Sequence, residues 1–181
     1  MEDKSNNGQQ VYENGSAFVN IQLSERRIDI FFAIVFFLFA ITSAISDAVP
    51  TLGIVMSPTS TNVLARANYW YASTTDTLFM NPPVWMRFVT GLSAFVYGPF
   101  FLVLVYCLVK GKNRIQLPAI IYATMISSIT GIIVFGVEFF GEPLYRTPNV
   151  LKFMMFNLPY VLVPLLLLVR MRKPMPFTRK F

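Results

Sequence analysis

Carboxylates are the side chains of this sequence best suited to acid and base chemistry. The 181-residue chain has no histidine, one cysteine and nine acidic residues. The lack of histidine excludes Ser/His/Asp triads, Cys/His dyads and the usual proton shuttle near neutral pH. A single cysteine, Cys107, forms no internal disulfide or cysteine-rich metal site, and no phosphate-binding glycine loop is present. We therefore expect no metal and no cofactor, and any catalysis falls to carboxylates, tyrosines or lysines.

Three acidic residues are the candidates for one shared site: Asp47, Asp76 and Glu138. Each is in or beside a long apolar segment. A carboxylate at the edge of membrane hydrocarbon costs a few kcal/mol unless it is paired or hydrated, and it usually marks function. The structural alternative is that Asp47 marks the membrane interface, Asp76 caps the helical turn that follows it, and Glu138 pairs with Arg146.

Four apolar segments must position these acids. The chain is 55% hydrophobic and only 13% charged, with a mean hydropathy of +0.55, which is too apolar for a water-soluble domain. The segments run roughly over residues 28–46, 84–109, 117–140 and 150–169. Each is close to the ~20 residues that cross ~30 Å of hydrocarbon as a helix. The sequence therefore predicts an all-α fold, a four-helix transmembrane bundle.

Basic residues predict the orientation of this bundle. They gather before the first segment, between the second and third, and after the fourth: Arg26, Arg27, Lys110, Lys112, Arg114, Arg170, Arg172, Lys173, Arg179 and Lys180. Because Lys and Arg accumulate in cytoplasmic flanks, we expect both termini in the cytoplasm and the three acids toward the opposite side. The net charge of +6 is mainly a topology signal, with a secondary attraction to anionic membrane lipids, and we expect no nucleic-acid partner.

The same segments divide the chain into three parts. Residues 1–27 are rich in Asn, Gln, Ser and Gly, and we expect them to be a disordered cytoplasmic tail. Residues 28–173 form the four-span membrane domain, and residues 174–181 form a basic cytoplasmic tail. The first apolar segment begins too far from the terminus for a signal peptide, so we expect it to be a retained span.

Polar side chains recur at helical spacing in every span, which predicts a pocket. Together with two aromatic residues of the first long loop, the candidate pocket-lining residues are Thr90, Ser93, Tyr97, Asn157, Tyr160, Trp70 and Tyr71. Such stripes converging near the acids are typical of a largely apolar pocket with a few polar groups, here near the non-cytoplasmic side. The alternatives are close helix packing for the stripes and an interfacial aromatic belt for the loop. Residues 64–71 could instead form a short helix that caps the bundle and presents Asp76 to the pocket.

Four motifs in order resemble the EXPERA superfamily, which includes emopamil-binding sterol isomerases and the sigma-2 receptor branch, the latter being nearer. They are D-x5-P-P-x-W at 76–85, Y-G-P-F-F at 97–101, L-P-A-I-I-Y at 117–122 and N-L-P-Y-V-L-V-P at 157–164. The resemblance implies an endoplasmic-reticulum protein whose pocket opens toward the membrane and takes sterols or amphiphilic amines. It assigns cation binding to Asp47 and Asp76, and it likens Asn157 to an asparagine of the isomerases. The second-helix glutamate of these relatives is absent here.

These observations support three hypotheses of different classes. The first is a protein that binds a sterol, a related isoprenoid or a cationic amphiphile through Asp76, Asp47 and Glu138. The alternative is an enzyme, an isomerase or terpenoid cyclase, in which the same acids protonate the substrate and aromatic rings stabilise a carbocation. The third is an adaptor that binds another membrane protein through its packing stripes, which would also permit a homodimer.

Overall fold

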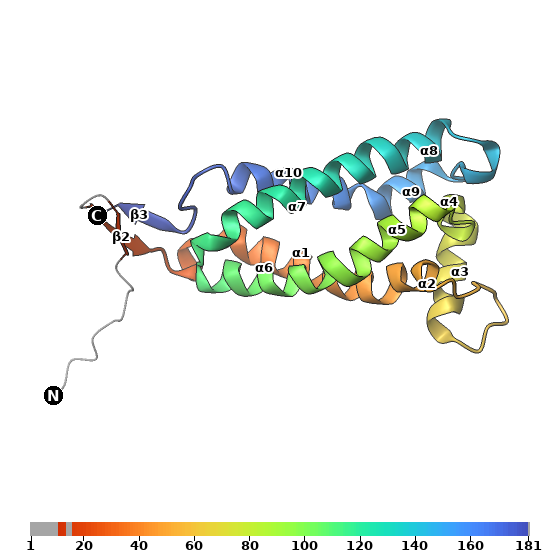
Figure 1. The fold of residues 1–181 in the computed structure, drawn as a ribbon, viewed down its shortest axis with the longest axis horizontal. Coiled ribbons are helices and arrows are strands. Elements are labelled where there is room, and N and C mark those ends of the chain that lie inside the picture. Colours follow the sequence, from red (N-terminus) through yellow and green to blue (C-terminus); the bar gives the residue numbers. More distant parts are fainter. Residues whose placement is uncertain (1–10, 14–15, 181) are drawn as a thin grey trace.

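The predicted four-span helical bundle is confirmed by the computed structural model, which describes residues 11–13 and 16–180. Four helical segments are long and apolar enough to cross a membrane: Arg27–Thr51, Val84–Lys110, Asn113–Phe140 and Val150–Arg170. They lie side by side along the long axis of the molecule (Figure 1). Each span is composed of two α-helices. In order these are α1 (Arg27–Thr42) and α2 (Ala48–Thr51), α5 (Val84–Leu92) and α6 (Gly98–Lys110), α7 (Gln116–Ser128) and α8 (Phe135–Phe140), and α9 (Val150–Asn157) and α10 (Pro159–Arg170).

Three of the four spans change helical geometry in the middle. Single π-helical segments, Ser43–Asp47, Ser93–Tyr97 and Ile129–Val134, join the two halves of the first, second and third spans. A π segment inserts an extra residue per turn and is frequent at functional sites. Because the extra residue rotates everything after it, side chains on the two sides of such a segment do not keep the spacing of a regular α-helix.

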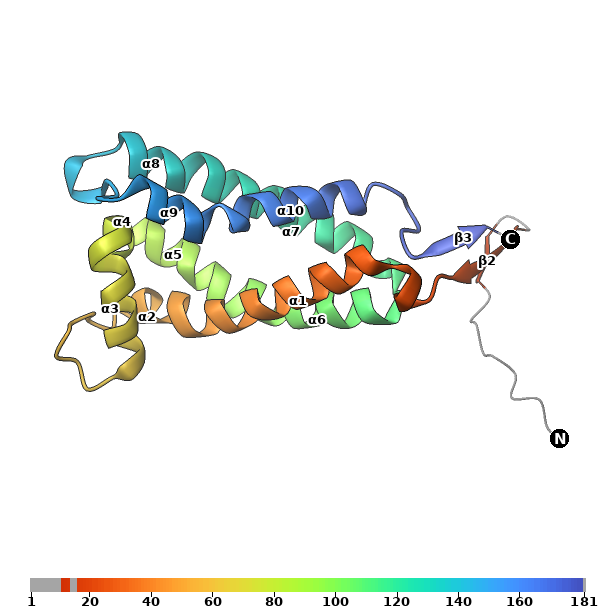
Figure 2. The ribbon, with the colours of Figure 1, turned by 180° about the vertical axis from the view of Figure 1, so that it is seen from behind.

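Aromatic side chains form the core where the spans meet. Helix α1 packs against α6, and α7 packs against α10. Phe36 is fully buried, and its ring lies 5.7 Å from that of Phe101 and 5.9 Å from that of Tyr122. Figure 2 shows the same two helix pairs from behind. This arrangement buries large rings from three spans in one cluster, in stacked and edge contacts that favour aromatic packing.

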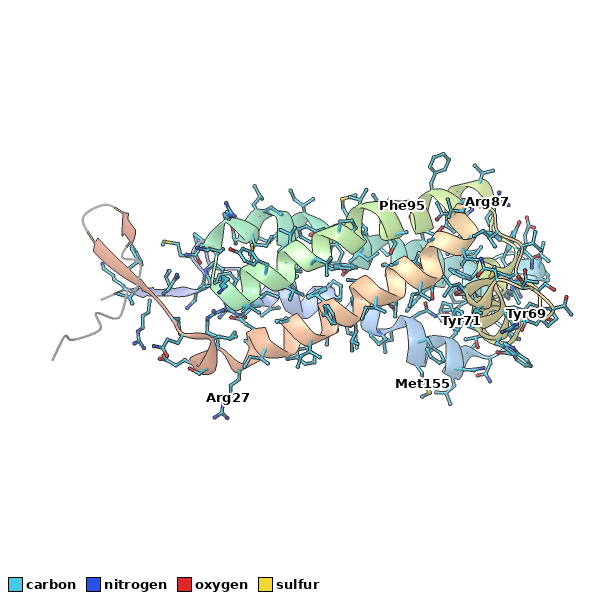
Figure 3. All side chains as sticks on the ribbon, turned by 90° about the horizontal axis from the view of Figure 1, so that it is seen from below. Arg27, Tyr69, Tyr71, Arg87, Phe95 and Met155 are labelled. Carbon is cyan, nitrogen blue, oxygen red and sulfur yellow. The ribbon has the colours of Figure 1, made fainter. Side chains whose placement is uncertain are left out.

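The outer faces of the spans are apolar as well. Phe88 is 75% exposed and Leu151 is 74% exposed, although both belong to helices. Figure 3 shows Phe95 and Met155 projecting away from the bundle. A helix that is apolar on every side is either buried or in contact with lipid. These faces therefore fit a bundle surrounded by hydrocarbon.

A small helical cap covers the end of the bundle away from the strands. It consists of α3 (Val63–Thr75) and α4 (Thr77–Met80), which lie across the ends of the spans (Figure 1). The side chain of Asn62 caps α3 by accepting hydrogen bonds from the amides of Leu64, at 2.9 Å, and Ala65, at 3.2 Å. The loop before the second span is thus a structural element rather than a linker, as its apolar composition indicated.

The prediction that residues 1–27 form a disordered tail is wrong for the described part of that segment. One antiparallel sheet contains three strands in the order β1 (Val11–Glu13), β2 (Ser16–Asn20) and β3 (Thr178–Lys180). A short 3-10 turn, Leu23–Glu25, follows β2 in the sequence. The rest of the expected tail, residues 1–10 and 14–15, lies outside the described residues. Pairing of β2 with β3 joins the two ends of the chain. A pairing partner so distant in sequence is invisible to local composition.

The bundle end that carries this sheet is closed around one buried acid. Asp29 is fully buried, and it accepts a hydrogen bond from Arg26 at 2.7 Å and two from Arg170 at 2.7 and 2.8 Å. Both guanidinium groups also lie over the ring of Phe177, at 5.0 and 5.1 Å from its centre. The cluster therefore ties α1, α10 and the C-terminal segment together.

Candidate functional site

A cavity of about 360 Å³ lies within the bundle, below the cap formed by α3 and α4. Most of its wall is apolar, with Phe79, Met86, Val89, Ile126, Val134 and Phe156 contributing side chains. Its volume lies in the ~300–1,000 Å³ range of small-molecule sites. Of the described residues that line it, the only charged ones are Asp47 and Asp76. The cavity is therefore an apolar chamber with two carboxyl groups in its wall.

Seven of the ten residues predicted for the site line this cavity. They are Asp47, Tyr71, Asp76, Thr90, Ser93, Asn157 and Tyr160, and they come from the first, second and fourth spans and from α3. The other three, Glu138, Tyr97 and Trp70, do not line the cavity. Regular helical spacing therefore does not suffice to assign a side chain to the cavity.

Tyr97 was expected on the same face as Ser93, four residues earlier. The π-helical segment Ser93–Tyr97 rotates the chain between them, so that Tyr97 turns into the core instead. It is 6% exposed, its ring lies 5.1 Å from that of Tyr122, and its hydroxyl is 3.8 Å from the sulfur of Met125. The expectation that Tyr97 lines the pocket is thus corrected by the change of helical phase.

Trp70 and Tyr71 are neighbours on α3 and cannot both face the cavity. Successive residues of an α-helix point about 100° apart. Tyr71 lines the cavity, and Trp70 is 65% exposed on the outside. Figure 3 shows Tyr71 at the cap end of the molecule, opposite Arg27. Trp70 is therefore placed where an interfacial aromatic residue would be, which was the alternative considered for this cluster.

Asp76 joins α3 to α4 and is held by hydrogen bonds from both sides. One carboxyl oxygen, Oδ1, accepts from the backbone amide of Phe79 at 2.7 Å and so caps α4. The other oxygen, Oδ2, accepts from the hydroxyl of Tyr71 at 3.1 Å. Burial raises the pKa of Asp76, and burial also raises the pKa of Tyr71. The predicted helix cap is confirmed, and the same carboxyl group lines the cavity.

A chain of polar groups extends from Asp76 to the fourth span. The side-chain amide of Asn157 donates to the hydroxyl of Tyr71 at 2.8 Å and to the carbonyl of Phe153 at 3.0 Å. Because Asn157 donates to Tyr71, the phenol hydrogen is directed to Asp76. The position of the Asp76 carboxyl is thus fixed by groups from α3, α4 and α9.

Asp47 lies on the opposite wall, at the end of a π-helical segment. Its carboxyl accepts a hydrogen bond from Ser43 at 3.2 Å, and the Ser43 hydroxyl is 2.9 Å from that of Ser93. One turn further along, the hydroxyls of Thr51 and Thr90 are 2.9 Å apart. Ser93 and Thr90 therefore link the first and second spans while they line the cavity. Helix packing and pocket lining, considered as alternatives for this stripe, are both present.

Glu138 lies next to Asp76, on the side away from the cavity. It is 1% exposed, and its Oε1 atom accepts a hydrogen bond from the amide of Leu78 at 3.2 Å. Its carboxyl group is the neighbour of that of Asp76, because the two accept hydrogen bonds from the successive amides of Leu78 and Phe79. The alternative that Glu138 pairs with Arg146 is wrong, because the guanidinium of Arg146 donates to the carbonyl of Gly141 at 2.7 Å.

Two further lining residues, Thr42 and Thr130, were not predicted, whereas Ser46 lines the cavity as part of the polar stripe that contains Asp47. Thr42 shares a hydrogen bond of 2.8 Å with Tyr160. The spacing of Thr42 and Ser46, four residues apart in the first span, was the available signal. Among the described residues, no group of three or more His, Cys, Asp and Glu side chains could hold a metal ion.

A small-residue stripe, considered as a partner surface, is used within the chain. A side-chain carbon at Gly131 would lie 3.2 Å from Val161 of the fourth span, so this glycine lets the two helices approach closely. Ser127, on the same face, is 3.5 Å from the carbonyl of Val161. This part of the stripe packs α7 and the following segment against α10.

The fold and the site together define a class: a four-span membrane protein whose bundle and helical cap enclose an apolar cavity with carboxyl groups. The family model described as EXPERA (EXPanded EBP superfamily) matches residues 63–171. The chain therefore belongs to the EXPERA family, as the sequence motifs predicted. The matched region includes Asp76, Glu138 and Asn157, and the first span with Asp47 precedes it.

Sequence comparison also identifies a similar curated protein, the sigma intracellular receptor 2 of Xenopus tropicalis. It is 35% identical over 112 residues, which are 56% of this chain and 64% of that relative. The match therefore spans less than two thirds of the relative's length. It supports the sigma-2 branch of the family for this chain.

Proposed function

We propose that this protein binds a sterol, a related isoprenoid or a cationic amphiphile in its intramembrane cavity. The observation that carries this proposal is that two carboxyl groups, those of Asp47 and Asp76, stand in a wall that is apolar over most of its area. Such a cavity suits a ligand with a large apolar body and one positive charge. The ligand would be a lipid-soluble molecule, and no cofactor is required.

Two physical contributions would favour such a ligand. Burial of ~200 Å² of apolar ligand surface is worth ~5 kcal/mol at ~25 cal/mol per Å². A cation beside a carboxylate in a medium of low dielectric adds to this only if the two groups are in good geometry. The fixed position of Asp76, with donors on both of its oxygens, supplies a pre-organised partner. The receptor name of the similar Xenopus protein is a further support for ligand binding.

Catalysis by the same carboxyl groups is the alternative, and the arrangement of Asp76 argues against it. A general acid must direct its own proton toward the substrate. Both oxygens of Asp76 instead accept hydrogen bonds from the protein. We therefore expect that membranes containing the wild-type protein convert neither sterols nor polyprenyl epoxides. Formation of an isomerised or cyclised product, detected by mass spectrometry, would establish the enzyme instead.

The proposal also includes the membrane in which the protein lies and its orientation there. We place the protein in the endoplasmic-reticulum membrane with both termini in the cytoplasm and the cavity toward the lumen. This placement is supported by the distribution of Lys and Arg between the spans and by the sigma-2 relative. Sterol and isoprenoid ligands would then reach the cavity from the surrounding bilayer.

The first test changes Asp76 to asparagine, which preserves size and one of the two acceptor oxygens but removes the charge. We expect Asp76→Asn to weaken binding of a long-chain trimethylammonium probe by roughly tenfold or more, because a charge-assisted contact is worth ~1.5–3 kcal/mol. Binding of the matched neutral probe, in which carbon replaces the ammonium nitrogen, should change little. Both affinities are measured with purified protein in lipid nanodiscs.

Glu142→Gln is the matched control, because it removes a carboxylate outside the cavity that is exposed in the structure. It should leave both affinities at the wild-type value. Full retention of the cationic probe by Asp76→Asn would contradict the proposed role of Asp76. Lipid extraction of the wild-type protein followed by mass spectrometry would then identify what the cavity holds.

A further inference from the structure

One oxygen of the Glu138 carboxyl group has no hydrogen-bond donor among the described residues. Glu138 is 1% exposed, and of its two carboxyl oxygens Oε1 accepts from the amide of Leu78. Within the described part of the chain, Oε2 is buried and has no hydrogen-bond donor. The neighbour of this carboxyl group is that of Asp76, which is 3% exposed and accepts from the next amide along the chain, that of Phe79. Two buried carboxyl groups thus meet, and one oxygen of the pair lacks a partner.

Two carboxylates in such contact cannot both be ionised. Like charges at hydrogen-bonding distance in a buried site repel strongly, and known pairs of this kind share one proton. A shared proton also resolves the missing donor, because it gives Oε2 of Glu138 a hydrogen to donate. Cations do not relieve the repulsion, because no salt bridge to either carboxyl group is found among the described residues.

The hydrogen-bond donors around the pair indicate which member holds the proton. Asp76 accepts from the Phe79 amide at 2.7 Å and from the Tyr71 hydroxyl at 3.1 Å. Glu138 accepts one longer bond, from the Leu78 amide at 3.2 Å. Hydrogen bonds to a carboxylate favour its charged form. The environment therefore favours Asp76 as the anion and Glu138 as the acid.

We propose that Glu138 is a neutral positioning residue whose carboxyl O–H donates to Asp76 and keeps it as the carboxylate that meets a cationic ligand. Glu138 does not line the cavity, so it acts through Asp76 rather than by touching the ligand. This role deepens the proposed function and rests on it for the ligand. The proton shared by the pair is a property of the protein alone and can be tested without any ligand.

Other ionisable groups near the pair do not replace this proton. Lys152 of α9 donates to the hydroxyl of Thr74 at 2.8 Å, and Arg146 donates to a backbone carbonyl. The remaining ionisable groups on the surrounding elements are Arg66, Tyr69 and Tyr71 on α3, Asp47 across the cavity, Glu142 after α8 and Tyr145 in the following turn. The guanidinium of Arg66 donates to the carbonyl of Ser60. Asp47 and Glu142 would add negative charge, so they reinforce the need for a proton on the pair.

The sign of the pH dependence follows from the pKa of Asp76. Burial raises this pKa, and the hydrogen bond from Glu138 lowers it part of the way back. Binding of a permanently charged cation needs the ionised form, so it is lost as the pH falls through the raised pKa of Asp76. Removal of the Glu138 donor raises that pKa further, and the loss of binding then begins at a higher pH.

Two substitutions separate a donor from a mere space-filling group. Glu138→Gln keeps a donor in its side-chain amide, and Glu138→Leu has a similar size but no donor. In nanodiscs at neutral pH we expect Glu138→Gln to bind the trimethylammonium probe within about threefold of the wild type, and Glu138→Leu to lose roughly tenfold. The acid limb of Glu138→Leu should move to higher pH. Equal affinities and pH profiles for both variants would overturn the proposal.

Infrared spectroscopy tests the proton without a ligand. At neutral pH the wild-type protein should show the C=O band of a protonated carboxyl group that disappears in Glu138→Gln and is unchanged in the control Glu142→Gln. An unchanged spectrum in Glu138→Gln would show that Glu138 is ionised and would overturn the proposal. If the band behaves as expected but the wild type binds no cationic probe, the proposed function fails while the shared proton stands.

Discussion

At the residue scale, Asp29 and Asp76 are two buried carboxyl groups with opposite surroundings. Asp29 has two guanidinium groups, each with a contact of 2.7 Å, so its charge is fully matched within the protein. Asp76 has hydroxyl, amide and carboxyl neighbours and, among the described residues, no cation. A charge that is matched internally stabilises the fold, and a charge that is not matched is available to a ligand. This difference separates a structural acid from a candidate binding acid.

The first stability prediction concerns Asp29. We expect Asp29→Asn to lower the free energy of unfolding by ~3–5 kcal/mol, because it leaves the charges of the buried Arg26 and the half-buried Arg170 without their partner. The measurement is unfolding of the purified protein in mixed micelles with increasing denaturing detergent.

Glu25→Gln is the matched control for that experiment. Glu25 also pairs with an arginine, Arg179, but at 3.3 Å and with both side chains largely exposed. Its loss should change the free energy of unfolding by less than about 1 kcal/mol. If the two substitutions had the same small effect, the buried cluster would not be what holds the chain ends to the bundle.

At the scale of the elements, the π-helical segments decide which side chains reach the cavity. Asp47 and Ser93 belong to two of these segments, and Thr130 belongs to the third. All three line the cavity. The extra residue in each segment brings a polar side chain inward and turns a later one, such as Tyr97, into the core. Regular helical spacing therefore predicts the polar stripes of the spans, but it does not predict which of their side chains point into the cavity.

One prediction at the scale of the elements concerns the turn between the second and third spans. Gly111 ends α6 in the left-handed region, at φ 64° and ψ 43°, and a side-chain carbon there would lie 3.2 Å from the guanidinium of Arg26. We expect Gly111→Ala to cost ~1–2 kcal/mol in the free energy of unfolding, since this backbone conformation disfavours any Cβ. The same detergent titration measures the loss.

Gly136 offers the opposite case within α8. A side-chain carbon at Gly136 would meet nothing within 4 Å, and its backbone is helical. We expect Gly136→Ala to be neutral or to stabilise the protein by up to ~1 kcal/mol, because alanine has the higher helix propensity. A loss of stability in Gly136→Ala as large as that in Gly111→Ala would contradict the assignment of the cost to backbone conformation.

At the scale of the whole molecule, the two ends of the bundle differ in kind. One end carries the three-stranded sheet and the Asp29 cluster, and the other carries the helical cap over the cavity (Figure 1). The first end is fixed by ion pairs and backbone pairing, and the second holds the unmatched carboxyl groups. A ligand is therefore expected to affect the cap end and to leave the end with the termini unchanged.

The orientation of these ends in the membrane is the last prediction. The native Cys107 is 2% exposed, so it gives little background for thiol labelling. A membrane-impermeant maleimide added to sealed microsomes should modify Lys173→Cys on the cytoplasmic side and spare Thr61→Cys in the loop before α3. Detergent should make Thr61→Cys reactive. The reverse pattern would show that the cavity faces the cytoplasm.

Features that depend on composition and local spacing can be predicted from the sequence. Four runs of apolar residues are long enough to span a membrane, and because lipid contact needs only apolar side chains, their number follows directly. Their boundaries follow less closely, since the first span continues past residue 46 to Thr51. The cap at Asp76 and the family motifs are local patterns as well. The candidate acids Asp47 and Asp76 were found because an ionisable residue beside hydrocarbon is costly and therefore conspicuous.

The contacts between these residues are visible only in the folded bundle. It placed Glu138 behind Asp76 instead of beside Arg146, and it matched Asp29 with an arginine 141 residues away. It also turned Tyr97 into the core and paired β2 with β3. Each of these outcomes depends on helical phase or on contacts between distant segments. Such contacts form only in the assembled bundle, so they cannot be predicted from local sequence.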